Sequence, residues 1–120
     1  MASGVYRYQR IDVFTDKPFC GNPLAVFTHA EGLDAESMQR IARELHLSET
    51  TFVFPSGDQG ADYDVRIFSP LAELPTAGAP SLGTVFALAR EEKRREDGRF
   101  VLQQKDGPVS VTMVAPMMTM

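Results

Sequence analysis

The stretch Leu47-Ser48-Glu49-Thr50-Thr51-Phe52-Val53-Phe54 marks a change of secondary structure in the chain. Helical spacing precedes it, and its second half is an apolar, β-branched run typical of a strand. Glu49 stands at the junction, where rigid elements on both sides would fix its carboxylate, as proton transfer requires. A single glutamate between a helix and a strand is also commonly a solvated surface residue. These residues alone leave both interpretations open.

The helix that precedes this stretch is predicted from apolar residues at spacings of three and four. Met38, Ile41, Ala42 and Leu45 fall on one face of such a helix. Asp34 is the expected N-cap, because its side chain can accept a hydrogen bond from a backbone N–H of the first turn.

Three pairs of strands are predicted from alternating or apolar runs separated by turn residues. The pairs are residues 5–14 with 24–27, 51–54 with 63–67, and 99–104 with 109–114. The first pair encloses a loop that carries Cys20 and Asn22. Asp106-Gly107 provides the hairpin turn of the last pair.

Residues 69–80 contain three prolines and a glycine, and we expect no regular structure there. A buried helix follows over residues 82–90, and the mixed charges of residues 91–96 are typical of a solvated helix end. Strands and helices therefore alternate in one α+β unit without a linker or a repeat.

The composition limits the classes of function. The chain has 120 residues with 12 basic and 16 acidic side chains, a net charge of −4, which gives no electrostatic reason to bind nucleic acid or an anionic membrane. Its one cysteine, Cys20, fits a reducing cytoplasm, and we find neither a signal peptide nor a membrane span. The expectation is a cytoplasmic protein of one domain, residues 1–120.

Few residues outside Glu49 indicate chemistry. The small residues from Gly78 to Thr84 begin the buried helix, and they either let an anion reach its N-terminal amides or serve tight packing. Cys20 is either a proton-shuttling thiol or a small apolar residue. His29 and His46 lack partners at ligand spacing, so no metal is expected. Nucleotide-binding loops and a serine elbow are missing from the sequence.

Several motifs in order give the chain a family resemblance. They are Ile11-Asp12-Val13-Phe14-Thr15-Asp16, Pro18-Phe19-Cys20-Gly21-Asn22-Pro23-Leu24-Ala25-Val26-Phe27, Ile41-Ala42-Arg43-Glu44, Leu47-Ser48-Glu49-Thr50, Arg66-Ile67-Phe68-Ser69-Pro70 and Glu73-Leu74-Pro75. Together they resemble the N-terminal half of the phenazine-biosynthesis isomerase (PhzF-like) family. The resemblance implies a diaminopimelate-epimerase-like lobe, a curved and mostly antiparallel sheet around a central helix. Family members have two such lobes with the active site between them.

The resemblance also implies a chemistry: cofactor-free isomerisation, in which an acidic residue moves a proton on a small carboxylic substrate of a biosynthetic pathway. Glu49 matches the catalytic glutamate of the family. The matching substrate-binding candidates are Asn22, Ser48, Gly78, Ala79, Ser81, Gly83 and Thr84. No metal or cofactor is implied.

Two departures from the family pattern bear on activity. Ala79 stands where the family commonly has histidine, and the C-terminal lobe with its Asp-x-Ala-Thr-Gly-Ser motif is absent from this sequence. We expect a homodimer in which a second copy completes the cleft, because a two-fold interface is the simplest closed arrangement. A separately encoded C-terminal lobe and an artificial truncation are the alternatives. Besides the isomerase, we consider a catalytically impaired lobe that binds or sequesters a small metabolite, and a structural lobe that only associates with a partner protein.

Overall fold

The computed structural model describes residues 5–13, 21–57, 60–75, 78–92 and 98–112. The elements in this part of the chain are β1 (Gln9–Val13), β2 (Asn22–Phe27), α1 (Ala35–Leu45), β3 (Glu49–Pro55), β4 (Tyr63–Phe68), β5 (Glu73–Leu74), α2 (Gly78–Glu92), β6 (Arg99–Gln104) and β7 (Gly107–Thr112). Neither α1 nor α2 is long and apolar enough to cross a membrane.

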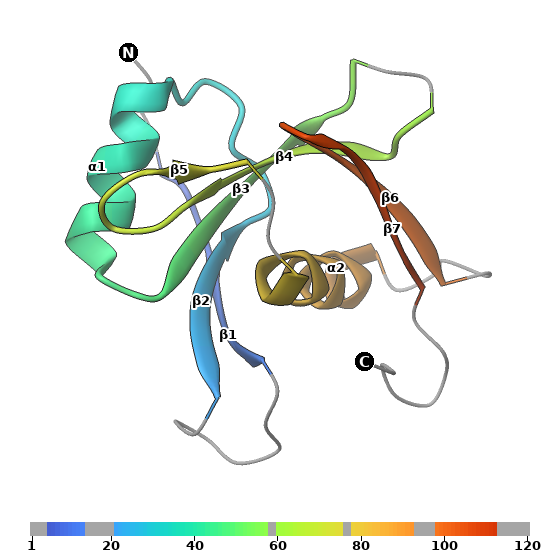
Figure 1. The fold of residues 1–120 in the computed structure, drawn as a ribbon, viewed down its shortest axis with the longest axis horizontal. Coiled ribbons are helices and arrows are strands. Elements are labelled where there is room, and N and C mark those ends of the chain that lie inside the picture. Colours follow the sequence, from blue (N-terminus) through green and yellow to red (C-terminus); the bar gives the residue numbers. More distant parts are fainter. Residues whose placement is uncertain (1–4, 14–20, 58–59, 76–77, 93–97, 113–120) are drawn as a thin grey trace.

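The described strands form one sheet in the order β1-β2-β3-β4-β6-β7, and β5 pairs with β4 outside this path. The β2–β3 and β4–β6 pairs are parallel and all other pairs are antiparallel. Each parallel pair is joined through a helix, as parallel strands require. The sheet curls around α2, while α1 lies against the outer face (Figure 1). The α+β prediction, a curved and mostly antiparallel sheet around a central helix, is confirmed.

Strand β3 divides the interior into two cores, because successive side chains of a strand point to opposite faces. Val53 belongs to the core between the sheet and α2, which includes the buried Leu24, Val85 and Leu88. Phe52 belongs to the core between the sheet and α1. The strand that begins at Glu49 is thus clamped between both helices.

Helix α1 begins and ends as its sequence predicts. The Asp34 side chain accepts a hydrogen bond from the Ser37 backbone N–H (2.8 Å), and this bond lowers the pKa of the Asp34 carboxyl. Met38 and Ala42 are buried against the sheet. His46 takes a left-handed conformation (φ 54°) and its N–H donates to the Ala42 carbonyl, which ends the helix three residues before Glu49.

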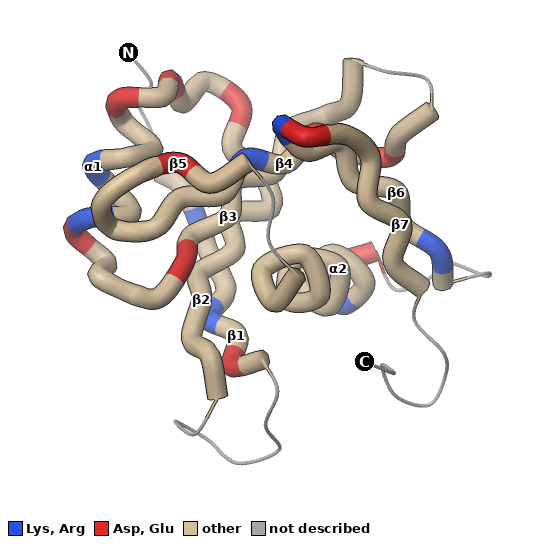
Figure 2. The backbone as a smooth tube through the Cα atoms, viewed as in Figure 1, with Lys and Arg blue, Asp and Glu red and all other residues tan. Residues whose placement is uncertain are grey.

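Helix α2 is enclosed by the sheet because its first three turns carry no charge. Figure 2 shows its charged residues only at the far end, where Arg90, Glu91 and Glu92 lie. Its small residues allow a close approach: a Cβ added to Gly83 would lie 2.9 Å from Cδ1 of the fully buried Leu24. The central helix is therefore held directly against β2.

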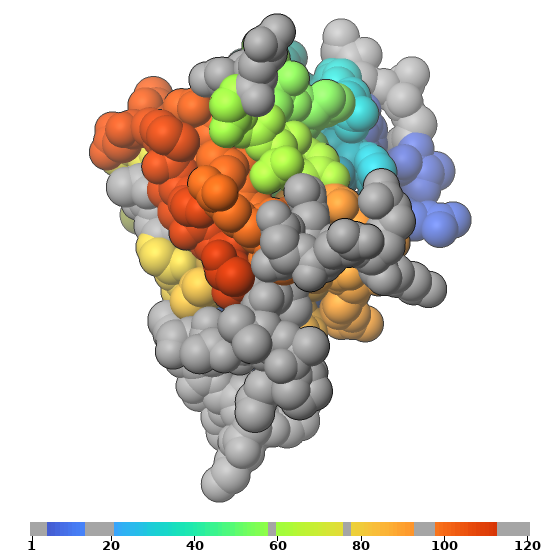
Figure 3. Space-filling view, turned by 90° about the vertical axis from the view of Figure 1, so that its right-hand side faces the viewer, coloured from blue at the N-terminus to red at the C-terminus, as the bar shows by residue number. Residues whose placement is uncertain are grey.

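The three predicted hairpins are confirmed as the antiparallel pairs β1–β2, β3–β4 and β6–β7. Figure 3 shows the β6–β7 hairpin beside the β3–β4 hairpin on one face of the molecule. The assignment of Asn22 to the first loop was wrong, since Asn22 is the first residue of β2 and pairs with Val13. Pro23 is tolerated there because it lies near the strand end. Cys20 lies outside the described residues.

The prediction of no regular structure across residues 69–80 was also wrong. The two-residue strand β5 pairs with the end of β4. Helix α2 begins at Gly78, which agrees with the helix start predicted at the small residues Gly78 to Thr84. A bidentate ion pair holds β5 in place: Arg66 Nε and Nη2 donate to the two carboxylate oxygens of Glu73, both at 2.8 Å. Pro70 and Pro75 flank the strand, so their missing N–H groups do not interrupt its pairing.

Candidate active site

Glu49 lies at the first position of β3, half-buried, where α1 has just ended. Thr51 and Val53 contact α2 or its core, so by strand alternation the Glu49 side chain lies on the same face of the sheet. The carboxylate is thus placed by two well-packed elements, which is the fixed geometry expected of a proton-transferring group.

Asn22 holds one oxygen of this carboxylate. Its Nδ2 donates to Glu49 Oε1 at 3.0 Å, although the two residues are 27 positions apart in the chain. The contact follows from the parallel pairing of β2 with β3, in which Leu24 is the register partner of Glu49 and Asn22 is two residues earlier on the same face. Within the described residues, Glu49 Oε2 makes no hydrogen bond. One oxygen is therefore oriented by Asn22, and the other has no hydrogen-bond partner in the described part of the chain.

The second turn of α2 packs on the strands that carry this pair. Gly83 packs on Leu24, the register partner of Glu49, and Thr84 bonds to Thr51 two residues further along β3. Gly78 is exposed, and a Cβ added to it would have no atom within 4 Å. The first amides of a helix have no partner inside the helix, and they carry the positive end of its dipole. This end of α2 can therefore receive an anionic group.

The side chains of Ser81 and Thr84 point into the protein instead. Ser81 is 2% exposed and accepts a hydrogen bond from Gln104 Nε2 at 2.5 Å. Thr84 is fully buried, 2.6 Å from the Pro80 carbonyl and 2.9 Å from the Thr51 hydroxyl. A carbonyl only accepts, so the Thr84 hydroxyl donates to the Pro80 carbonyl and accepts a hydrogen bond from the Thr51 hydroxyl. Any contact of Ser81, Gly83 or Thr84 with a ligand would have to come from the backbone.

The other candidates have different settings. Ser48 is half-buried and immediately precedes β3, while Ala79 is half-buried and packs against the α2 core. Among the described residues, the structure brings together Asn22 and Glu49. Gly78 and Ala79 begin α2, whose second turn packs on β2 and β3. The sequence did not indicate that Gln104 and Thr51 bond to Ser81 and Thr84. No pattern near these residues predicts it, because the partners meet only when α2 packs on the sheet.

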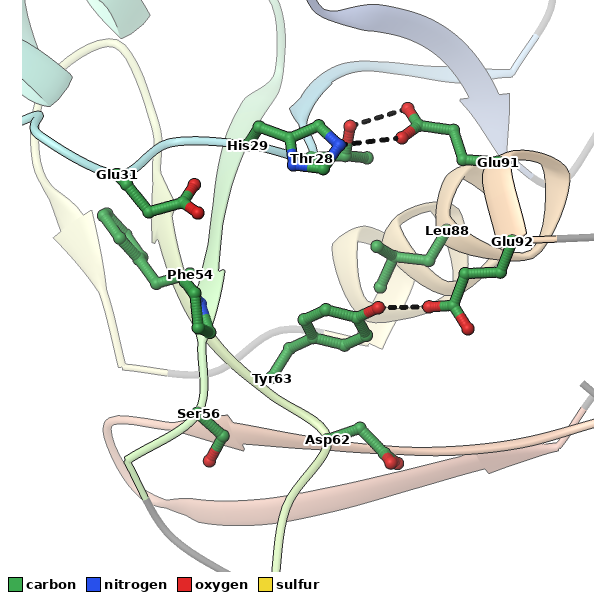
Figure 4. A pocket seen from close by; sticks show the side chains of 11 residues that line it. Thr28, His29, Glu31, Phe54, Ser56, Asp62, Tyr63, Leu88, Glu91 and Glu92 are labelled. Carbon is green, nitrogen blue, oxygen red and sulfur yellow. Dashed lines mark hydrogen bonds and ion pairs between the residues drawn. The ribbon is translucent and has the colours of Figure 1, made fainter.

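Two cavities lie away from this pair. The first, of about 530 Å³, is at the opposite end of α2, and Figure 4 shows two of its carboxylates, those of Glu91 and Glu92, engaged by their neighbours. Glu91 accepts from the Thr28 hydroxyl (2.6 Å) and contacts His29 Nε2 (3.3 Å), and Glu92 accepts from the Tyr63 hydroxyl.

The second cavity, of about 540 Å³, lies beside the Arg66–Glu73 pair. Neither cavity includes Glu49, Asn22 or Gly78 among its lining residues.

Comparisons with known proteins agree with this fold. Residues 11–118 match the family described as phenazine biosynthesis-like protein, PhzC-PhzF. The trans-2,3-dihydro-3-hydroxyanthranilate isomerase of Pseudomonas aeruginosa is 45% identical over 113 residues, which cover 88% of this chain and 40% of that enzyme. A PhzF-family protein from Bacillus anthracis superimposes with a TM-score of 0.80 at 33% identity, covering 89% of this chain and 35% of its own.

A more distant structure shows the fold alone. The hydroxyproline epimerase of Agrobacterium vitis has a TM-score of 0.68 at 13% identity, over 94% of this chain and 39% of that protein.

The lobe and its neighbours define a class, the epimerase-like and isomerase-like α+β proteins. Within that class, the chain belongs to the PhzC-PhzF family. It spans 34 to 40% of the length of the first curated relatives that it matches.

Proposed function

We propose that this chain supplies the glutamate half of a cofactor-independent isomerase or epimerase that moves a proton on a small carboxylic substrate. The observation that carries this proposal is the Asn22–Glu49 contact, in which an amide orients one oxygen of a half-buried carboxylate at 3.0 Å. The name of the Pseudomonas relative supports a dihydro-hydroxyanthranilate or a related small carboxylate as the substrate class.

In the proposed reaction, the available oxygen of Glu49 takes a proton from a substrate carbon. The electron pair left behind shifts into the conjugated system of the substrate, and a proton is returned at another position, so no electrons are gained or lost overall. The amides of Gly78 and Ala79 hold the substrate carboxylate at the start of α2. A positioned general acid or base typically contributes about 10²- to 10⁴-fold to a rate.

A second copy of the chain completes the cleft in this proposal. Its support is that Glu49 lines neither of the two cavities described above. A separate protein that carries the second lobe is the alternative partner. Neither nucleic acid nor a membrane has a part in the proposal, since the net charge is −4.

Glu49→Gln tests the mechanism, because glutamine keeps the shape and the bond with Asn22 after an amide flip but cannot take a proton. Wild type and variant are incubated in D₂O with a panel of small carboxylates that includes the substrate of the Pseudomonas relative. NMR should show deuterium incorporation by the wild type and a loss of about 10²-fold or more in the variant.

Glu36→Gln is the matched control, since Glu36 is 88% exposed on α1 and should leave the exchange rate unchanged. Full exchange by Glu49→Gln would remove Glu49 from the mechanism. If wild type binds a carboxylate but never exchanges deuterium, the metabolite-binding lobe replaces the isomerase, and Ala79 in place of the family histidine accounts for it.

A further inference from the structure

Two pairs of buried polar side chains join the beginning of α2 to the sheet. Thr51 of β3 donates its hydroxyl to the Thr84 hydroxyl at 2.9 Å, and both residues are fully buried. Gln104, the last residue of β6, donates to the Ser81 hydroxyl at 2.5 Å, and these two residues are also buried. Hydrogen bonds therefore tie the helix to two different strands, in addition to its apolar contacts.

The Thr84 hydroxyl extends the connection from β3 into the first turn of α2. It donates to the Pro80 carbonyl at 2.6 Å, and Pro80 directly follows Ala79. A threonine hydroxyl that bonds to the carbonyl four residues earlier can bend a helix. The path from Thr51 through Thr84 to Pro80 thus ends at the turn whose amides the proposed function assigns to the substrate carboxylate.

The apolar neighbours of the two hydroxyls indicate that burial alone does not require them. Val53 follows Thr51 by two residues on the same face of β3, Val85 follows Thr84 in α2, and both valines are buried in the core. Apolar contact is non-directional, whereas a hydrogen bond restricts the distance and the angle between its two groups. The hydroxyl pair therefore adds a defined position of α2 along β3 and a defined rotation about the helix axis.

The same strand carries the proposed base. Glu49 precedes Thr51 by two residues on one face of β3, about 6.6 Å along the strand. We propose that Thr51 and Thr84 are positioning residues for the proposed reaction. Their hydrogen bond fixes the first turn of α2 relative to Glu49, so a substrate carboxylate held at that turn presents its reacting carbon to the base. This inference rests on the proposed function and specifies which residues set its geometry.

Thr51→Val tests the inference, because valine removes the donated proton and keeps the volume of the side chain. The Thr84 hydroxyl still donates to Pro80, and the Gln104–Ser81 bond remains, so the variant should fold. In the deuterium-exchange assay, kcat should fall about tenfold or more and KM should change less than about threefold, because binding of the carboxylate is kept and its alignment with the base is lost.

Thr51→Ser separates positioning from stability. Serine keeps the hydroxyl but loses a buried methyl group, so this variant should unfold at a lower urea concentration than Thr51→Val and still exchange at nearly the wild-type rate. A purely structural role predicts the opposite order, in which the exchange rate follows the stability.

Thr50→Val is the matched control on the same strand. Thr50 is fully buried, and its hydroxyl has no hydrogen-bond partner in the described part of the chain. Its side chain lies on the opposite face of β3 from Thr51. The same chemical change at this position should therefore leave the exchange rate unchanged.

A measurement on the ligand-free protein makes the test independent of activity. Residual dipolar couplings give the directions of the Gly78 and Ala79 N–H bonds relative to the sheet, and Thr51→Val should change these directions while Thr50→Val should not. Unchanged directions in Thr51→Val would overturn the inference. So would wild-type exchange by Thr51→Val, an equal loss of exchange in Thr51→Ser, or the same effects in Thr50→Val.

Glu49→Gln, measured in parallel, separates this inference from the proposed function. If Glu49→Gln exchanges as fast as wild type, or if wild type does not exchange at all, the proposed function fails. The N–H directions of the first turn then decide by themselves whether Thr51 positions α2.

Discussion

The close packing of Gly83 in α2 against Leu24 and Val13 leads to a quantitative prediction. A methyl group added there by Gly83→Ala would lie 2.9 and 3.2 Å from the two terminal carbons of Leu24 and 3.1 Å from Cγ2 of Val13. Carbon atoms normally rest about 3.5 to 4.0 Å apart, so all three contacts are too short. Leu24 is fully buried and Val13 is 3% exposed, so neither side chain can move into solvent.

The expected cost follows from two opposing effects. An extra methyl group in a packed core costs about 1 to 3 kcal/mol, while replacing glycine by alanine inside a helix gains roughly 1 kcal/mol. Because three contacts are short at once, a cost of about 2 to 3 kcal/mol is expected here, and the net prediction is a destabilisation of about 1 to 2 kcal/mol. A domain of this size loses about 4 to 8 °C in Tm for each kcal/mol.

Urea unfolding and thermal melting measure this effect, and Gly78→Ala in the same helix is the matched control. Gly78 has no atom within 4 Å of the added carbon, so its variant should match or slightly exceed the wild-type stability. In the double variant Leu24→Ala with Gly83→Ala, the space left by the Leu24 side chain can accept the new methyl group. The loss of unfolding free energy should therefore be smaller than the sum of the losses of the two single variants. A Gly83→Ala variant as stable as wild type, or additive losses in this cycle, would refute the packing argument.

Two further predictions concern charged side chains. The hydrogen bonds from Arg66 lower the pKa of Glu73, so their pair stabilises the fold at neutral pH and loses this contribution as the pH falls below about 4 and Glu73 is protonated. Arg66→Met should therefore lower the free energy of unfolding in urea at pH 7 by up to about 1 kcal/mol, a modest amount because the pair is partly exposed. At pH 2.5 the loss should be much smaller. An equal loss at both pH values would contradict a stabilising Arg66–Glu73 ion pair. Asp34→Ala should lower the Tm by removing the cap of α1, whereas Asp34→Ser should restore most of it, and equal melting of both variants would exclude a capping role.

Local patterns predicted most of the elements. The spacing around Met38, the cap at Asp34 and the three hairpins are encoded within a few residues of one another, so the sequence is sufficient to locate them. The two-residue strand β5 was missed because it is short and flanked by two prolines, so no local pattern indicates a strand. Its pairing with β4 and the Arg66–Glu73 ion pair become visible only in the tertiary structure.

The sequence by itself determined that a carboxylate stands where a helix gives way to a strand, and that small residues begin a buried helix. Only the tertiary structure decided which neighbours these residues meet. Asn22 reaches Glu49 because β2 and β3 pair in one parallel register, and the hydroxyl of Thr84 is used internally because α2 rotates that face toward the sheet. The register of β2 with β3 and the rotation of α2 about its axis depend on packing throughout the core, so they cannot be predicted from a short stretch of sequence.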